Sequence, residues 1–132
     1  MLERVRYEGA YPTLERADEA VQSVLAALGR QLVGDERVDL AARLPVEAAL
    51  VLTAQVPAVT SLTGWEFVKD LAERTGSTPA SVRWNVGAVL AAVSQLAGHE
   101  LLDRIIDQLP SGYALLFGKA ELHQPRRRTG PR

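Results

Sequence analysis

Apolar residues recur at three- and four-residue intervals along two long stretches of the chain. The first stretch carries Leu14, Ala17, Val21, Val24, Leu25, Leu28 and Leu32, and the second carries Val82, Val86, Val89, Leu90, Val93 and Leu96. This spacing predicts two amphipathic α-helices, each with one apolar stripe. Thr13 and Thr78 are suited to cap their starts, with Pro79 at the first helical position. Gly34 and Gly98 are suited to their C-terminal ends.

A shorter helical pattern follows each long one and ends at a Leu-Pro pair. Residues 35–44 place Val38, Ala41 and Leu44 in phase, and residues 99–109 place Leu101, Leu102, Ile105, Ile106 and Leu109 in phase. A residue before proline is pushed out of the helical region, so these helices should end near the leucine. We expect Pro45 or Pro110 to open a final short helix. That helix would return Leu50, or Leu115 and Phe117, to the core.

The two patterns are copies of one another. Residues 20–52 align without a gap on residues 85–117, and nine positions are identical: Val21/Val86, Val24/Val89, Leu25/Leu90, Ala26/Ala91, Ala27/Ala92, Leu44/Leu109, Pro45/Pro110, Ala49/Ala114 and Leu50/Leu115. A single copy cannot bury its apolar face alone, so two copies should pack on each other. The sequence therefore predicts one all-α domain over residues 1–122. It would contain about eight helices in two tandem four-helix repeats, about 2–54 and 63–120, related by a pseudo-twofold axis.

A further helix is expected before the second copy. The stretch TGWEFVKDLAERTG begins with a Thr63 and Glu66 capping box and ends at Gly76. Trp65 falls in phase with Val68 and the apolar residues that follow, so we expect Trp65 in the core. Residues 2–8 would form its shorter counterpart in the first repeat, and residues 53–62 would link the halves.

These stretches also resemble a known family. AVQSVLAALGRQL, LAARLP, EFVKDLAERTG, VGAVLAAVSQLAG and IIDQLPSGYALLF are similar to the bacterial domain-of-unknown-function family 2267, from about Val5 to Leu122. The resemblance implies a small helical bacterial protein. The family has no established activity, cofactor or catalytic residue that could be transferred to this sequence.

Composition places the chain among ordinary soluble proteins. Of 132 residues, 47% are hydrophobic and 23% are charged, the net charge is −1, and there is no cysteine. Disulfides, thiol chemistry and cysteine-based zinc sites are therefore excluded. No apolar run has the roughly 18 residues that a membrane-spanning helix needs. With no signal-peptide pattern at the start, we expect a cytoplasmic protein without membrane attachment.

We find no catalytic, cofactor-binding or metal-binding constellation. His99, Glu100 and Asp103 share one helical turn, but Asp103 stands where a zinc-protease motif requires a second histidine. We interpret them as a solvated, acid-rich helix start. No serine has a nucleophile-elbow context, and no glycine-rich loop follows a strand. We therefore expect a protein that is not an enzyme and that uses no cofactor.

One aromatic residue is a candidate for contact with a partner. Trp84 lies off the main apolar stripe, in phase with Ala88 and Ala91. It can fill a groove between the halves or anchor a partner, and these alternatives stay open. Ala91 and three other small residues, Ala26, Ala27 and Ala92, are kept in both copies. They would allow close helix approach at the seam between repeats or at a subunit interface.

The C-terminal residues differ from the rest. Residues 123–132 contain Arg126, Arg127, Arg128 and Arg132 and no acid, so the remaining chain has an acidic excess. We expect a disordered basic tail that is either a solubilising end or a weak, salt-sensitive anion contact. The acidic body argues against nucleic acid as the main partner, and no helix shows a basic face.

Three functions follow as hypotheses. The first is a non-enzymatic cytoplasmic module that acts through a protein partner or self-association. The second is weak polyanion or nucleic-acid association through the arginine tail. The third is binding of a small apolar ligand in a cavity between the repeats.

Overall fold

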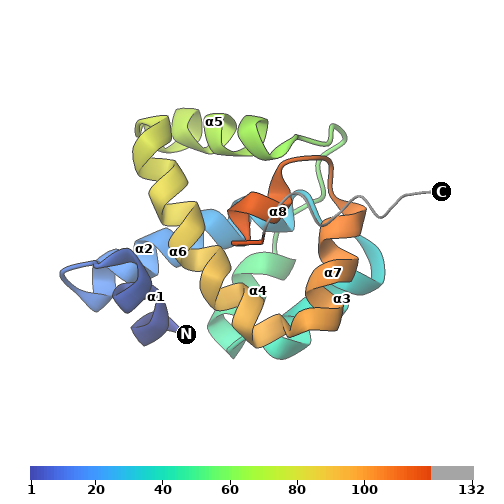
Figure 1. Cartoon of the computed structure of the whole chain (residues 1–132), viewed down its shortest axis with the longest axis horizontal. Coiled ribbons are helices and arrows are strands. Elements are labelled where there is room, and N and C mark those ends of the chain that lie inside the picture. The colour runs from blue at the N-terminus through green and yellow to red at the C-terminus, as the bar shows by residue number, and fades with distance from the viewer. Residues whose placement is uncertain (120–132) are drawn as a thin grey trace.

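The computed structural model describes residues 1–119, and within them the secondary structure is entirely helical (Figure 1). The helices are α1 (Leu2–Gly9), α2 (Leu14–Gly29), α3 (Gly34–Arg43), α4 (Val46–Thr53), α5 (Gly64–Thr75), α6 (Pro79–Ala97), α7 (His99–Gln108) and α8 (Tyr113–Leu116). The predicted all-α fold class and number of helices are confirmed for this part of the chain.

Most of the predicted helix ends are confirmed. The hydroxyl oxygen of Thr13 accepts a hydrogen bond from the Arg16 amide, and Thr78 caps α6 in the same way. Thr63 and Glu66 form the full capping box of α5. The prediction for Gly34 is wrong. Gly34 opens α3 with a φ of +69° instead of ending α2.

The two Leu-Pro pairs form the predicted corners, with one difference. Leu44 and Leu109 are extended, with ψ values of 155° and 153°, and the helices before them stop. Neither proline is the first residue of the next helix. Pro45 is the residue before α4, because its own ψ of 153° is extended. After Pro110 the chain passes through Gly112, at φ 98°, before α8 begins.

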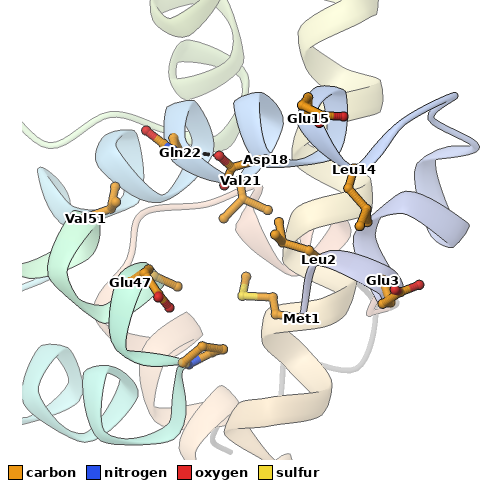
Figure 2. A pocket seen from close by; sticks show the side chains of 12 residues that line it. Met1, Leu2, Glu3, Leu14, Glu15, Asp18, Val21, Gln22, Glu47 and Val51 are labelled. Carbon is orange, nitrogen blue, oxygen red and sulfur yellow. Dashed lines mark hydrogen bonds between the residues drawn. The ribbon is translucent and has the colours of Figure 1, made fainter.

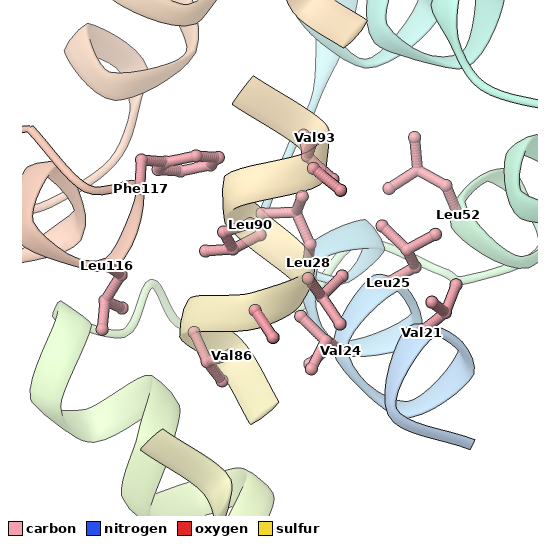
Figure 3. Close-up of a cluster of buried hydrophobic side chains, with 14 of the residues drawn as sticks. Val21, Val24, Leu25, Leu28, Leu52, Val86, Leu90, Val93, Leu116 and Phe117 are labelled. Carbon is pink, nitrogen blue, oxygen red and sulfur yellow. The ribbon is translucent and has the colours of Figure 1, made fainter. Parts of the chain in front are cut away.

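The two long helices cross at the centre, and the shorter ones surround them. α1 packs on both α2 and α6, and α5 packs on the same two helices, so each half contributes to the covering of the other. Figure 3 shows buried side chains of α2 and α6, including Val24, Leu28 and Leu90. Each of these three is fully buried. The seam between the long helices is therefore filled with aliphatic side chains.

Equivalent positions of the two copies have similar burial. Leu40 and its counterpart Ile105 are both fully buried, and so are the long-helix pair Leu25 and Leu90. The copies differ at their ends, because α4 has 8 residues and α8 has 4. Shared burial is consistent with a duplicated unit. The pseudo-twofold relation between the repeats stays a prediction.

Several residues expected in the core are exposed. Leu50 and Leu115 are 63% and 54% exposed, and their places are taken by Leu52 and Phe117 two residues later. The reason is the corner: the extended residues at each Leu-Pro pair set the rotation with which the following segment meets the core. Val38 is 65% exposed because α3 turns Leu40 inward instead.

Trp65 was expected in the core and is 62% exposed. It occupies the first turn of α5, where the backbone of Gly112 already lies against Gly64 and closes the inner side of that turn. The aromatic residue that enters the core is Phe67, which is 2% exposed. Its ring meets the buried ring of Tyr113 edge to face, with 5.4 Å between centroids.

Candidate functional site

A groove of about 680 Å³ opens between α1, the beginning of α2, and α4 (Figure 2). Its apolar lining residues are Met1, Leu2, Leu14, Val21, Pro45, Ala48 and Val51. Its polar lining residues are Glu3, Glu15, Asp18, Gln22 and Glu47. All three helices belong to the first predicted repeat, so this groove does not lie between the repeats.

The floor of the groove is continuous with the hydrophobic core. Val21 and Ala48 are 4% and 7% exposed, and Leu2 and Val51 are partly buried against the core cluster. Figure 2 shows the side chains of Leu2 and Val21 directed into the same space. A floor of this kind offers apolar contact to a group that enters the groove.

The rim of the groove is acidic. Glu3, Glu15 and Glu47 lie in the first turns of α1, α2 and α4, where the positive end of each helix dipole stabilises a carboxylate. The fourth acid, Asp18, accepts a hydrogen bond from the Gln22 amide nitrogen at 2.9 Å. Within residues 1–119, no basic side chain lines the groove or pairs with these four acids. The residues that line the groove therefore carry an excess of negative charge.

This combination is suited to binding. An apolar floor under four carboxylates attracts a group that is apolar on one side and cationic at its edges. The lining contains no histidine, serine or threonine, so it holds no hydroxyl nucleophile beside a base. The side chains that line the groove are suited to binding through apolar contacts and charge.

The predicted contact residues around Trp84 are only partly brought together. Trp84 is 58% exposed, and it lines a shallow hollow of about 470 Å³ together with Ala88 and Gly87. Ala88 is 6% exposed, and Ala91 is half-buried and outside this hollow. The indole Nε1–H donates to the carbonyl oxygen of Gly9 at 2.9 Å. Trp84 therefore joins α6 to the end of α1 and keeps a solvent-facing surface.

The repeated alanines lie along α2 and α6. Ala27 and Ala92 are 5% and 1% exposed, and Ala26 and Ala91 are half-buried. Because α2 and α6 contact each other, the buried pair contributes to close packing within the chain. Of the two alternatives for these alanines, the packing between the long helices is the one that this burial supports.

The histidine pattern is an exposed helix start, as interpreted. The side chain of His99 is 84% exposed, with its Nε2 3.6 Å from Asp103 Oδ2, and Lys119 Nζ lies 2.5 Å from Asp103 Oδ1. Within residues 1–119, no group of three or more His, Asp or Glu side chains is placed to hold a metal ion. The candidate anion contacts, Arg126, Arg127, Arg128 and Arg132, lie outside the described residues.

Comparison with known proteins identifies the family. A family model with the description "Uncharacterized conserved protein (DUF2267)" matches residues 1–116. The chain belongs to this family. The match covers α1 to α8 of the DUF2267 protein, and the family predicted from the repeated motifs is confirmed. No curated protein matches the chain. Among residues 1–119, none of the helices is long and apolar enough to cross a membrane.

Sequence reasoning did not find the groove of this DUF2267 protein. Taken by themselves, Glu15 and Asp18 are acids suited to a helix start. The signal that was available is an acid at the start of three helices, Glu3, Glu15 and Glu47, each beside apolar residues. Only the packing of α1 and α4 on α2 brings the first turns of these three helices to the same groove.

Proposed function

We propose that this DUF2267 protein is a non-enzymatic helical interaction module whose groove takes up a basic, apolar-faced segment of a protein partner. One observation carries the proposal: acids from three helices surround an apolar floor, and no basic side chain of residues 1–119 lines the groove. The proposal assigns the interaction role expected from the sequence to the groove. It also assigns a basic, apolar-faced segment as the partner.

The size and shape of the groove fit a small number of apolar side chains. Its volume of about 680 Å³ falls within the range of roughly 300–1,000 Å³ for ligand-binding clefts. An amphipathic helix presents apolar side chains three and four residues apart, and such helices commonly dock in grooves between helices. The partly buried Leu2 and Val51 would contact those side chains from opposite walls.

The charge of the groove favours a cationic partner. Lysine or arginine residues at the edges of the segment would lie near Glu3, Glu15 and Glu47. Charge of this kind accelerates association and makes it sensitive to salt. The same carboxylates repel a polyanion, so nucleic acid is disfavoured on this face.

The cellular location and the possibility of self-association follow the expectations from the sequence. We propose that the module acts in the bacterial cytoplasm, and that a second copy of the chain is one form that the partner could take. The acidic excess of residues 1–122 is compatible with binding a basic segment of either origin.

A pair of synthetic peptides tests the proposal. One is a short amphipathic helix of leucine and lysine, and the other has glutamate at every lysine position. We expect the lysine peptide to bind the full chain and to bind more weakly as salt is raised, and the glutamate peptide not to bind. Isothermal titration or fluorescence anisotropy measures both affinities.

Matched charge variants locate the binding. The double variant Glu15→Gln, Glu47→Gln should weaken the lysine peptide roughly two- to thirtyfold, since each exposed ion pair contributes ~0.2–1 kcal/mol. The control Glu73→Gln, Glu100→Gln changes the net charge equally at positions that do not line the groove. Equal weakening by both double variants, or binding of the glutamate peptide, would contradict the proposal.

A further inference from the structure

A second hollow, of about 490 Å³, lies where the two halves of the chain meet. It is lined by Tyr11 before α2, by residues of α2, by the end of α5, and by the start of α6. Unlike the groove, it has a hydroxyl or amide group on half of its lining side chains. None of its lining residues lines the groove.

One wall of the hollow is the indole of Trp84. The Nε1–H bond to the carbonyl of Gly9 fixes the orientation of the ring while 58% of the residue stays exposed. The shallow hollow beside Gly87 lies against the same side chain, so the indole separates two depressions of the surface. A half-exposed aromatic ring in a fixed orientation gives a flat apolar platform at low entropic cost to binding.

Beside this platform, Tyr11 and Asn85 form a hydrogen-bonded pair. The Tyr11 hydroxyl donates to Asn85 Oδ1 at 2.5 Å, and burial raises the pKa of Tyr11, so the hydroxyl stays protonated at neutral pH. This bond fixes the orientation of the Asn85 amide. Its Nδ2 has no protein partner among residues 1–119, and both of its donors are available to a ligand.

The remaining polar groups supply both acceptors and donors. The hydroxyls of Ser23 and Thr75 donate to carbonyl oxygens of their own helices, so their oxygens remain acceptors. Ser81 also lines the hollow, and its hydroxyl makes no hydrogen bond to another residue within 1–119. Arg16 and Glu19 lie 3.9 Å apart at the edge and offset each other's charge.

We propose that this hollow binds a neutral polyhydroxylated small molecule, a mono- or disaccharide, with its C–H face on Trp84 and its hydroxyls on Asn85 and Ser81. Sugar hydroxyls donate and accept at once, which matches a lining that offers both kinds of group. An anion or a cation would find no net charge in the Arg16 and Glu19 pair. A wholly apolar ligand would leave the polar groups without partners.

Tryptophan fluorescence tests the proposal directly. The chain has two tryptophans, so Trp65→Phe leaves Trp84 as the only indole reporter, and Trp65 does not line the hollow. We expect titration with maltose or N-acetylglucosamine to give a saturable change in Trp84 emission. Glycerol, a polyol without an extended C–H face, should give none. Saturation-transfer NMR on the full wild-type chain provides a second readout of the same sugars.

Two variants and one control test whether the sugar binds in this hollow. Trp84→Leu, followed by NMR, should weaken sugar binding about five- to tenfold, the loss expected for removing one aromatic contact. Ser81→Ala should weaken it severalfold without affecting the fold, whereas Ser61→Ala, outside the hollow, should not. The proposal is overturned if folded Trp65→Phe protein shows no saturable response to either sugar. It is equally overturned if glycerol binds as well as the sugars, or if the two serine variants bind alike.

Discussion

Gly64 and Gly112 lie backbone against backbone, at the start of α5 and just before α8. The Gly64 amide donates to the carbonyl of Ser111 at 2.8 Å, and a Cβ built on Gly64 would lie 2.6 Å from the carbonyl carbon of Gly112. A Cβ on Gly112 would lie 3.1 Å from the backbone of Gly64, and the φ of 98° at Gly112 also disfavours a side chain. This contact joins the start of α5 to the turn before α8.

We predict that Gly64→Ala lowers the free energy of unfolding by about 1–3 kcal/mol, because the new methyl group must displace backbone atoms. Gly87→Ala is the matched control. Its Cβ would meet only the flexible end of Arg83, and Gly87 lies in the interior of α6, where alanine is favoured by roughly 0.5–1 kcal/mol. Urea unfolding of both variants measures the difference. Equal stabilities would show that the contact can relax without cost.

Arg37 connects α3 to the ends of two other helices. Its guanidinium donates to the backbone carbonyl oxygens of Gly29, Leu32, Leu52, Thr53 and Gln55. Gly29 and Thr53 end α2 and α4, and neither helix has a basic residue in its own last turn. One cation therefore satisfies the free carbonyls and the negative dipole ends of both helices.

We predict that Arg37→Met destabilises the fold by about 1.5–3 kcal/mol, since it removes charged hydrogen bonds and leaves carbonyls without donors. Arg37→Lys should recover only part of this loss, because one ammonium group cannot reach the same set of oxygens. The exposed Arg83 is the control, and Arg83→Met should change stability by less than about 0.5 kcal/mol. Thermal unfolding followed by circular dichroism measures all three. An unchanged melting temperature for Arg37→Met would contradict this role.

Leu50 and Leu52 lie two residues apart in α4 and differ in burial. Leu52 is fully buried and Leu50 is 63% exposed. We predict that Leu52→Ala costs about 2–5 kcal/mol of stability, through lost burial and a cavity, and that Leu50→Ala changes stability by only a few tenths. Chemical denaturation of the two variants gives the comparison. Similar losses for both would mean that Leu50 is covered in solution, for instance by a second copy.

We predict that Tyr113 makes the free energy of unfolding fall at alkaline pH. Burial, and secondarily the charge of Glu66, raises the pKa of Tyr113 far above its usual 10.0. The unfolded chain loses this proton near pH 10 while the folded chain keeps it, so the free energy of unfolding decreases as pH rises above about 10. Tyr113→Phe should make this decline shallower. Urea unfolding from pH 8 to 11 measures the slope, and an unchanged slope would exclude Tyr113 as its source.

The same variant should lower stability at neutral pH. The Tyr113 hydroxyl donates to the carbonyl of Leu62 at 2.9 Å, and its loss leaves a carbonyl oxygen in a partly buried place without a donor. The expected cost is about 1–3 kcal/mol. Tyr7→Phe removes the hydroxyl of a residue that is 83% exposed and should leave the free energy of unfolding at neutral pH unchanged.

Local signals in the sequence were sufficient for the helices. Thr13, Thr63 and Thr78 mark helix starts because a cap depends on atoms within three residues of it. The Leu-Pro corners were readable for the same reason. Gly34 was misassigned because a glycine at positive φ suits the end of one helix and the approach to the next equally well.

The faces of the short helices were harder to predict than their bounds. Val38 and Leu40 are both candidates for the buried side of α3, and only its packing against α4 and α7 selects Leu40. Trp65 was placed in the core by its period, yet α5 buries Phe67 and leaves Trp65 62% exposed. A helix of about three turns has too few residues for its pattern to fix its rotation.

The sequence by itself determined the family, the helix positions and the expectation of a duplicated helical unit, because these depend on spacing and on short-range caps. The tertiary structure decided where the candidate sites lie. The acids Glu3, Glu15 and Glu47 form one rim, and Trp84 borders a polar hollow, only after distant helices pack together. Packing is selected by the burial of the whole chain, so no local pattern contains it.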